Sequence, residues 1–207
     1  MTPPAGQRPV VWFIDTASLI SMAIDPRIDA AVKEEIAAGG GTMVLIDVVR
    51  DELEYRRTQA TTAALAQGAL ASIGADWPWL STAWVDLDDV TPIQDDVADG
   101  KPLKDDYEHW AESTIILLCR QAHARGNALD VRFLSEDFDA RRVANREPNI
   151  TPLSLHRLFR NRVHRGAMTA TEAAELSKLI ENAGRGHDMT EDDFLGPLKL
   201  LGRAGRP

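Results

Sequence analysis

The sequence predicts an α/β fold in which helices cover both faces of a central parallel sheet. The first observation is that short apolar runs recur along the chain, at 10–14, 42–46 and 131–134. Each run has the length and composition of a strand that is buried on both faces. The second observation is that a stretch with helical spacing of its apolar residues follows each run. Strands that alternate with helices favour a parallel sheet between two helical layers.

The first apolar run, 10–14, ends at Asp15, and small polar residues then lead into a helix that contains Leu19 and Ile20. Open parallel sheets bind their ligands at the carboxyl ends of the strands, so Asp15 lies where chemistry is expected. Asp is also a favoured N-cap residue, and on this stretch alone a purely structural cap is the simpler interpretation. Recurrence of the same arrangement further along the chain favours a functional role.

The second run, 42–46, follows a helical stretch at 28–38 and three glycines at 39–41. It leads into a predicted helix that begins near Asp47. Glu52 then lies about a turn and a half beyond the strand end. A second carboxylate is therefore expected at the edge of the sheet that carries Asp15.

The middle of the chain is the least regular part. An Ala-rich helix is predicted over 58–74, and a short edge strand over 84–87. Between 86 and 108 there are nine acids against two lysines, which we interpret as a solvated acidic loop. The spacing does not match a calcium-binding EF-hand loop.

The third run, 131–134, follows a convincing amphipathic helix at 109–124. Glu112 lies on or beside the apolar stripe of that helix, where a carboxylate is costly unless it is paired or bound to a metal. The third run leads directly into Ser135, Asp137 and Asp139, and then into a helix at 140–144. A short strand near Ile150 and two further helices, 155–166 and 169–180, complete the prediction.

Length and composition predict one soluble domain. We assign 1–9 to a flexible leader, 10–183 to the domain with an acidic insertion at 74–108, and 184–207 to a polar tail. The net charge of -9 argues against a general nucleic-acid coat protein, although charge can be segregated along a chain. The one cysteine, Cys119, excludes an intramolecular disulfide and a cysteine-based zinc site. No signal peptide or membrane span is predicted, so the expected location is the cytoplasm.

The strand-end acids are predicted to converge in one cleft, with Asp139 or Glu136 as auxiliaries. The four principal members are Asp15, Glu52, Glu112 and Asp137. Carboxylates that lie this close raise one another's pKa, and a cation with oxygen ligands removes that cost. Mg²⁺ or Mn²⁺ is the natural occupant, because these motifs contain no histidine or cysteine. Such ions activate water and clamp the oxygens of a phosphodiester.

These residues, in this order, resemble the PIN domain, a family of metal-dependent ribonucleases that includes the VapC-type toxins of toxin–antitoxin pairs. The resemblance spans roughly 10–144 and rests on four pieces: Ile14-Asp15-Thr16 with Leu19-Ile20; Glu52-Leu53; Ala111-Glu112; and Leu134-Ser135-Glu136-Asp137 followed by Ala140-Arg141-Arg142-Val143-Ala144. It implies a three-layer α/β/α fold with a helical C-terminal extension. It also implies a Mg²⁺- or Mn²⁺-dependent endoribonuclease whose metal-binding and catalytic acids are Asp15, Glu52, Glu112 and Asp137, with Asp139 as a further ligand.

The chain departs from the family pattern at two positions. Ala17 stands where Asn or Ser is frequent, which leaves Thr16 or Ser18 to supply a hydroxyl to the substrate. Ala111 stands where Gly is frequent before the third acid. The resemblance further implies RNA as the substrate, with an antitoxin-like protein inhibitor or a second copy of the chain as candidate partners.

Charge segregation is consistent with an RNA substrate. Seven arginines share the region 141–165 with one acid, Glu147; they are Arg141, Arg142, Arg146, Arg157, Arg160, Arg162 and Arg165. Such a cluster can follow a phosphate backbone, and Arg141, Arg142 and Ser135 are the expected substrate-binding residues there. The alternative is that these arginines cover outer helix faces and pair with the acidic loop. Trp77, Trp79 and Trp84 are predicted to pack the insertion or to form an interface.

Two other functions compete with the nuclease. A phosphatase of the haloacid dehalogenase type also begins with an Asp after a strand, but its chemistry needs a second Asp two residues later, where Ala17 stands. A non-catalytic module that binds RNA or protein on the same scaffold is the second alternative. A metal-dependent cleavage assay separates these functions.

Overall fold

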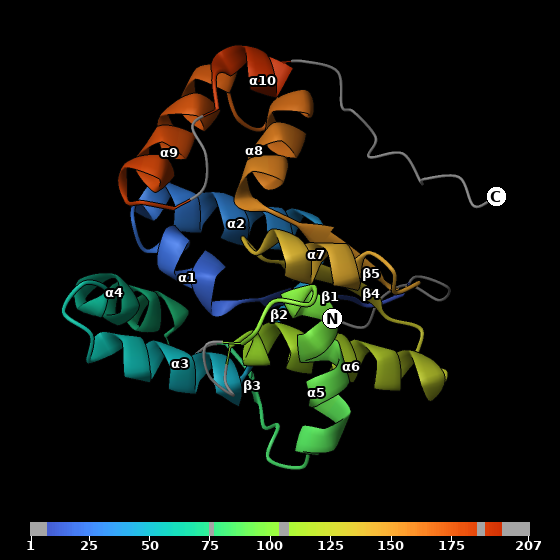
Figure 1. Cartoon of the computed structure of the whole chain (residues 1–207). Coiled ribbons are helices and arrows are strands. Elements are labelled where there is room, and N and C mark those ends of the chain that lie inside the picture. Colours follow the sequence, from blue (N-terminus) through green and yellow to red (C-terminus); the bar gives the residue numbers. More distant parts are fainter. Residues whose placement is uncertain (1–7, 75–76, 104–107, 186–188, 196–207) are drawn as a thin grey trace. The chain divides into compact units, whose positions relative to one another are not determined.

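The computed structural model describes residues 8–74, 77–103, 108–185 and 189–195, and the chain divides into two compact units (Figure 1). The first unit is Met1–Leu155 and the second is His156–Pro207. The boundary falls inside the range 10–183 that the sequence predicts as one domain. Most of the predicted leader, 1–9, lies outside the described residues.

The first unit is built on a five-stranded sheet with all strands parallel, in the order β3-β2-β1-β4-β5. The strands are β1 (Val10–Ile14), β2 (Thr42–Ile46), β3 (Trp79–Leu80), β4 (Asp130–Leu134) and β5 (Ile150–Leu153). In the register of the central pair, Val10 lies opposite Asp130 and Ile14 lies opposite Leu134. The two strands therefore end at the same edge of the sheet. This sheet confirms the predicted α/β fold class.

Seven helices of the first unit surround the sheet: α1 (Thr16–Met22), α2 (Pro26–Ala38), α3 (Asp47–Arg57), α4 (Ala63–Ile73), α5 (Leu87–Ala98), α6 (Trp110–Ala124) and α7 (Phe138–Ala144). In Figure 1, α1, α2 and α7 lie on one face of the sheet, and α3 and α6 lie on the other. The strands between them are apolar on both sides, and Ile14, Leu45 and Phe133 are buried. Burial of both sheet faces explains why these strands read as continuous apolar runs.

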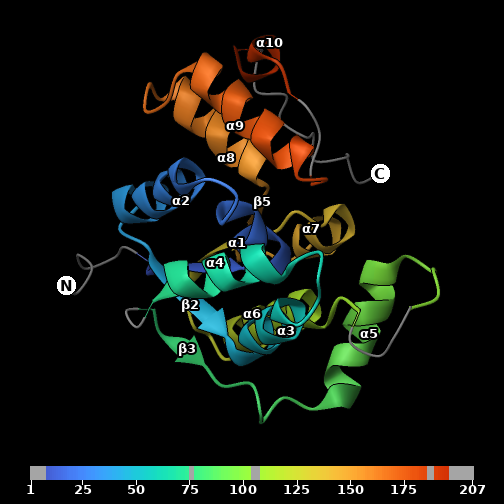
Figure 2. The same cartoon turned by 90° about the vertical axis from the view of Figure 1, so that its left-hand side faces the viewer.

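The predicted edge strand at 84–87 is wrong. The edge strand is β3, which pairs with β2 through Leu45 and Ile46 (Figure 2). Trp84 lies in the turn that follows, and its indole donates to the carbonyl oxygen of Ser81 at 2.9 Å. The β3 position is explained by Asp47, whose carboxylate accepts bonds from the amide and hydroxyl of Thr82 and so fixes the end of β3 beside α3.

The acidic stretch predicted as a solvated loop contains a helix, α5. Asp86 caps its start by accepting from the amide of Asp88 at 3.0 Å. Val90, Ile93 and Val97 recur at helical spacing and are buried. This apolar stripe packs α5 against α6 and α7, while the acidic side chains of α5 remain on its exposed face.

The second unit holds α9 (Ala170–Asn182), α10 (Glu191–Leu195) and, apart from its first residue, α8 (Leu155–His164). Thr169 caps α9, because its hydroxyl accepts from the amide of Glu172 at 3.1 Å. The predicted polar tail, 184–207, contributes α10 to this unit, and α10 buries Phe194 in contact with α9. Residues 196–207 lie outside the described part of the chain.

Cys119 is a buried free thiol, as its apolar surroundings predict. Within the ranges that the structure covers, no helix combines the length and the apolar character needed to cross a membrane.

Candidate functional site

The four predicted acids come from four elements that meet at the carboxyl edge of the sheet. Asp15 directly follows β1, and Asp137 follows β4 after two residues. Glu52 lies in the second turn of α3, which begins where β2 ends, and Glu112 lies in the first turn of α6. Because α6 runs back toward the start of β4, its own first turn lies at the edge where β4 ends.

The carboxylate of Asp15 is fully buried, and one of its two oxygens caps the helix α1. Its Oδ1 accepts from the amide of Ser18 at 2.6 Å and so caps α1. Its Oδ2 is buried and has no hydrogen-bond partner among the described residues. Burial raises the pKa of Asp15 to about 6, the Ser135 and Ser18 hydroxyls lower it in part, and the charge of Glu136 raises it further.

Glu52 and Glu112 lie in the same electrostatic environment. Burial raises the pKa of Glu52, and the charge of Asp15 adds to that effect while Thr16 and Arg56 oppose it. Burial also raises the pKa of Glu112 well above its ordinary value, and the charges of Asp15, Glu52 and Asp137 each raise it further. Charge interactions connect Glu112 with the other three acids and Glu52 with Asp15. That the four acids form one functional site stays a prediction.

Asp137 is the most exposed of the four acids and caps α7. Its Oδ1 accepts from the amide of Ala140 at 2.9 Å, and its own amide donates to the Ser135 hydroxyl at 3.1 Å. Its Oδ2 lies 3.2 Å from Nδ1 of His109. His109 precedes α6 with a left-handed backbone at φ 61°. The sequence analysis missed His109, because no local pattern pairs a helix-start residue with an acid on a later helix.

The three hydroxyl residues predicted to bind substrate are buried: Thr16, Ser18 and Ser135. Thr16 acts on Glu52, and Ser18 and Ser135 act on Asp15 by lowering the pKa of those acids. Ser135 also links two strands, since its amide donates to the carbonyl oxygen of Leu153 at 2.9 Å. A direct contact of these hydroxyls with substrate stays a prediction.

The carboxylate of Asp139, which is predicted as a further metal ligand, forms ion pairs with two basic side chains. Its carboxylate lies 3.4 Å from both the Lys101 ammonium and the Arg142 guanidinium. Slight burial raises its pKa, but these two cations outweigh burial and lower it. Glu136, the other auxiliary, accepts from the amide of Leu155 at 2.7 Å.

The arginines of α7 differ in their partners. Arg141 donates to the carbonyl oxygen of Ser135 at 2.6 Å. Arg142 pairs with Asp99 at 3.1 Å, and Arg146 lies 3.6 Å from Asp96. Pairing with the acidic segment is the alternative that the sequence left open for these arginines. In the second unit, Arg162 is buried and donates to the carbonyl oxygen of Ala167 at 3.3 Å, so it does not lie on an outer face.

Two of the three tryptophans of the insertion contact basic side chains. The Lys33 ammonium lies 5.2 Å from the ring centre of Trp77, and the Arg50 guanidinium lies 5.4 Å from that of Trp79. Trp84 is exposed. The predicted interface at this segment stays a prediction.

A Mg²⁺ or Mn²⁺ ion fits this group in donor chemistry and charge. The donors are carboxylates and hydroxyls, which hard cations prefer, and Oδ2 of Asp15 is a buried acceptor with no partner among the described residues. The described side chains are not already arranged as a set of metal ligands. Within the described ranges, no three His, Cys, Asp or Glu side chains are arranged to hold a metal ion.

No protein-family model matches the chain, and no curated protein matches it. The resemblance to the PIN family therefore rests on the sequence motifs named above and stays a prediction.

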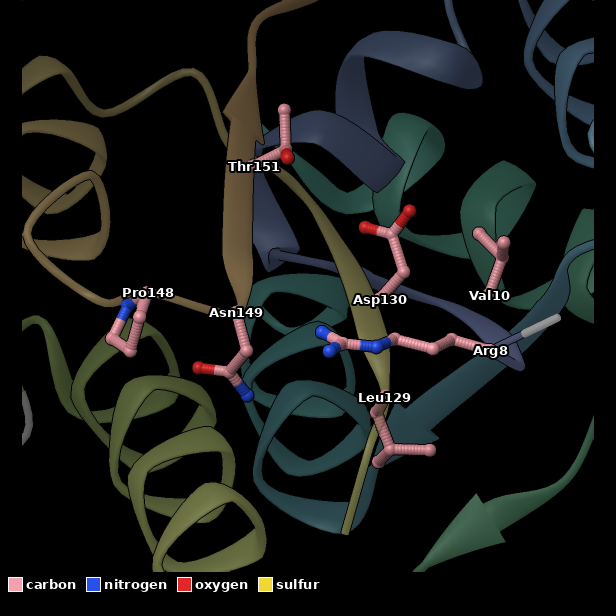
Figure 3. A pocket seen from close by; sticks show the side chains of 7 residues that line it. All are labelled: Arg8, Val10, Leu129, Asp130, Pro148, Asn149 and Thr151. Atoms are coloured by element: carbon pink, nitrogen blue, oxygen red, sulfur yellow. The ribbon is translucent and has the colours of Figure 1, made fainter. Parts of the chain in front are cut away.

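A separate pocket of about 270 Å³ lies at the opposite edge of the sheet (Figure 3). It is lined by residues at the amino ends of β1, β4 and β5 and by their neighbours, namely Arg8, Val10, Leu129, Asp130, Pro148, Asn149 and Thr151. Figure 3 shows the Arg8 guanidinium between Asp130 and Asn149. Asp130 is already paired with Arg132 at 3.0 Å. Because the pocket lies at the amino ends of the strands, it is separate from the carboxylate site at their carboxyl ends.

Proposed function

We propose that this protein is a Mg²⁺- or Mn²⁺-dependent endoribonuclease with a PIN-like site formed by Asp15, Glu52, Glu112 and Asp137. One observation carries the proposal. Four acids from four elements converge at the carboxyl edge of a parallel sheet, and burial and mutual repulsion raise the pKa of three of them. Buried carboxylates that repel one another lower the free energy of unfolding. A cation that binds only the folded state would offset this loss of stability.

Each residue of the site has a distinct task in this proposal. Asp15 offers its unpartnered Oδ2 to the cation while its Oδ1 stays with Ser18. Ser135 holds the amide of Asp137 and so fixes that carboxylate at the start of α7. The bound ion supplies the activation of water and the neutralisation of phosphodiester oxygens. Because burial and the neighbouring carboxylates raise the pKa of Glu112, binding of a cation there should be favoured as the pH rises.

The test is an RNA cleavage assay with Mn²⁺, Mg²⁺ or EDTA. The wild-type protein should cleave only with metal, and Asp15→Asn should reduce the rate by a hundredfold or more. Asp25→Asn is a matched control, because Asp25 caps α2 as Asp15 caps α1 but keeps 19% of its side chain exposed and lies outside the group. Absence of metal-dependent cleavage by the wild-type protein contradicts the proposal.

A non-catalytic module on the same scaffold is the second candidate. It is favoured by the lack of a ready-made metal group among the described residues. Under this function the wild-type protein binds RNA or a protein partner with equal affinity in Mn²⁺ and in EDTA.

We also propose a substrate, a partner surface and a cellular location. RNA is the substrate, and the segment with Trp77, Trp79 and Trp84 is the surface for an antitoxin-like inhibitor or a second copy. The reducing cytoplasm is the proposed location, in keeping with one buried, unpaired cysteine.

A further inference from the structure

Phe138 is an exposed aromatic side chain at the candidate site. It is the first residue of α7 and directly follows Asp137, yet its side chain is 68% exposed. Isolated exposed hydrophobics are common on proteins, so exposure by itself indicates nothing. Two further observations distinguish Phe138: its position next to a site carboxylate, and the cation held beside its ring.

That cation is the guanidinium of Arg141. Its central carbon lies 6.0 Å from the centre of the Phe138 ring, one helical turn along α7. The same guanidinium donates to the carbonyl oxygen of Ser135 at 2.6 Å, so the end of β4 holds it in place. Ring and cation thus form a pre-positioned pair that is anchored to the residues carrying Asp137.

We infer that the Phe138 ring stacks on an unpaired base of single-stranded RNA, while Arg141 neutralises a neighbouring phosphate. The inference rests on the proposed nuclease function and specifies the form of its substrate. Exposed aromatic rings beside basic side chains bind single strands with little sequence preference, because every base has a π-face. In a duplex the bases are already stacked on one another, and stacking on Phe138 requires that a base leave the stack. The enzyme should therefore prefer single-stranded RNA.

The test compares cleavage of a single-stranded oligoribonucleotide with cleavage of its duplex in Mn²⁺. Phe138→Ala should raise KM for the single strand about tenfold and change kcat less than twofold, since loss of one stacked base weakens binding by about that factor or more. Phe138→Trp should restore the wild-type KM, and Phe138→Leu should not, because leucine keeps apolar bulk without a π-face. Tyr55→Ala is the matched control, since Tyr55 on α3 is 67% exposed and should leave KM unchanged.

A spectroscopic measurement separates stacking from a structural role of Phe138. In an Asp15→Asn background, which blocks cleavage, an oligoribonucleotide carrying 2-aminopurine should lose fluorescence on binding to the Phe138 protein and not to Phe138→Ala. An unchanged KM in Phe138→Ala, failure of Phe138→Trp to restore it, or equal cleavage of duplex and single strand overturns the inference and leaves the nuclease standing. A wild-type protein that neither cleaves nor binds RNA removes the proposed function and the inference together.

Discussion

The amide of Ser18 donates to Oδ1 of Asp15 over 2.6 Å, and this bond leaves Oδ2 of the same carboxylate buried without a partner among the described residues. Asp15 is therefore both a helix cap and an acid with a free acceptor. The two roles use different oxygens, so they can be separated by experiment.

The Asp15→Asn variant should keep the N-cap of α1 and lose affinity for the cation. Asn caps a helix about as well as Asp, and removal of one charge relieves the repulsion within the acid group, so the metal-free variant should be at least as stable as the wild type. At a hundredfold excess over Kd, Mn²⁺ should stabilise the wild type by about 2.7 kcal/mol and the variant far less. Thermal melting with and without Mn²⁺ measures this, with Asp25→Asn as the control. Equal metal-induced shifts in wild type and Asp15→Asn would show that Asp15 is not a ligand.

The metal-free protein should become less stable as the pH rises from about 4 to about 7. Carboxyl groups with a raised pKa bind protons more tightly in the folded state, so their stabilising contribution is complete below the unfolded pKa and is lost as the pH passes the folded pKa. For Asp15, whose pKa rises from 3.8 to about 6, this contribution is about 3 kcal/mol. Glu52 and Glu112 act in the same direction.

The same pH series has an acid limit. The pKa of Asp47 is lowered, because hydrogen bonds from Thr82 and Ser81 outweigh its burial, and hydrogen bonds from Arg27 lower that of Asp25. These two groups lose their stabilising contribution as the pH falls below about 4. The melting temperature should pass through a maximum near pH 4, and Asp15→Asn should flatten only the neutral side. A melting temperature that rises from pH 5 to pH 7.5 without metal contradicts this prediction.

Glu112→Gln should stabilise the metal-free protein at neutral pH and have much less effect at pH 4. Burial and the neighbouring carboxylates disfavour ionisation of Glu112 in the folded state, and glutamine removes that cost. Urea denaturation at both pH values measures the change in the free energy of unfolding. The control is Glu54→Gln on α3, where an exposed pair with Arg57 at 2.5 Å contributes about 0.5 kcal/mol or less. Equal effects of the two variants at pH 7 would refute the assignment of Glu112 to the buried group.

The double variant Asp96→Asn/Asp99→Asn should bind RNA more tightly and with a steeper salt dependence. Asp99 holds Arg142 at 3.1 Å and Asp96 lies 3.6 Å from Arg146, so their neutralisation removes the carboxylate beside Arg146 and one of the two beside Arg142, and both arginines become more available to phosphates. Each added phosphate contact on a single strand steepens the slope of log K against log salt by about 0.7. A salt titration followed by fluorescence anisotropy gives the slope.

The control for this prediction is Asp88→Asn/Asp95→Asn, which removes the same charge from the exposed face of α5 without releasing either arginine. An equal gain in affinity for both double variants means that net charge, and not release of Arg142 and Arg146, sets RNA binding.

The sequence pattern was sufficient to predict four of the five strands of the described sheet, β1, β2, β4 and β5, and the strand-end positions of Asp15 and Asp137. It was sufficient because strands buried on both faces are continuous apolar runs, and an acid after such a run must lie at the carboxyl edge. The same reasoning failed for α5, where exposed acids conceal the stripe of Val90, Ile93 and Val97. It also failed for the two-residue strand β3, which depends on the contact between Asp47 and Thr82.

The sequence by itself determined the α/β class, because that class follows from residue type and short-range spacing. The oxygen-ligand chemistry of the site stays a prediction. Only the tertiary structure decided that Asp139 pairs with Lys101 and Arg142 while Asp137 joins the acid group and contacts His109. Only the tertiary structure left one oxygen of Asp15 buried and unpartnered among the described residues. Burial, hydrogen-bond geometry and Coulomb interaction depend on residues far apart in the chain, and so they are fixed only when the sheet brings its strand ends together.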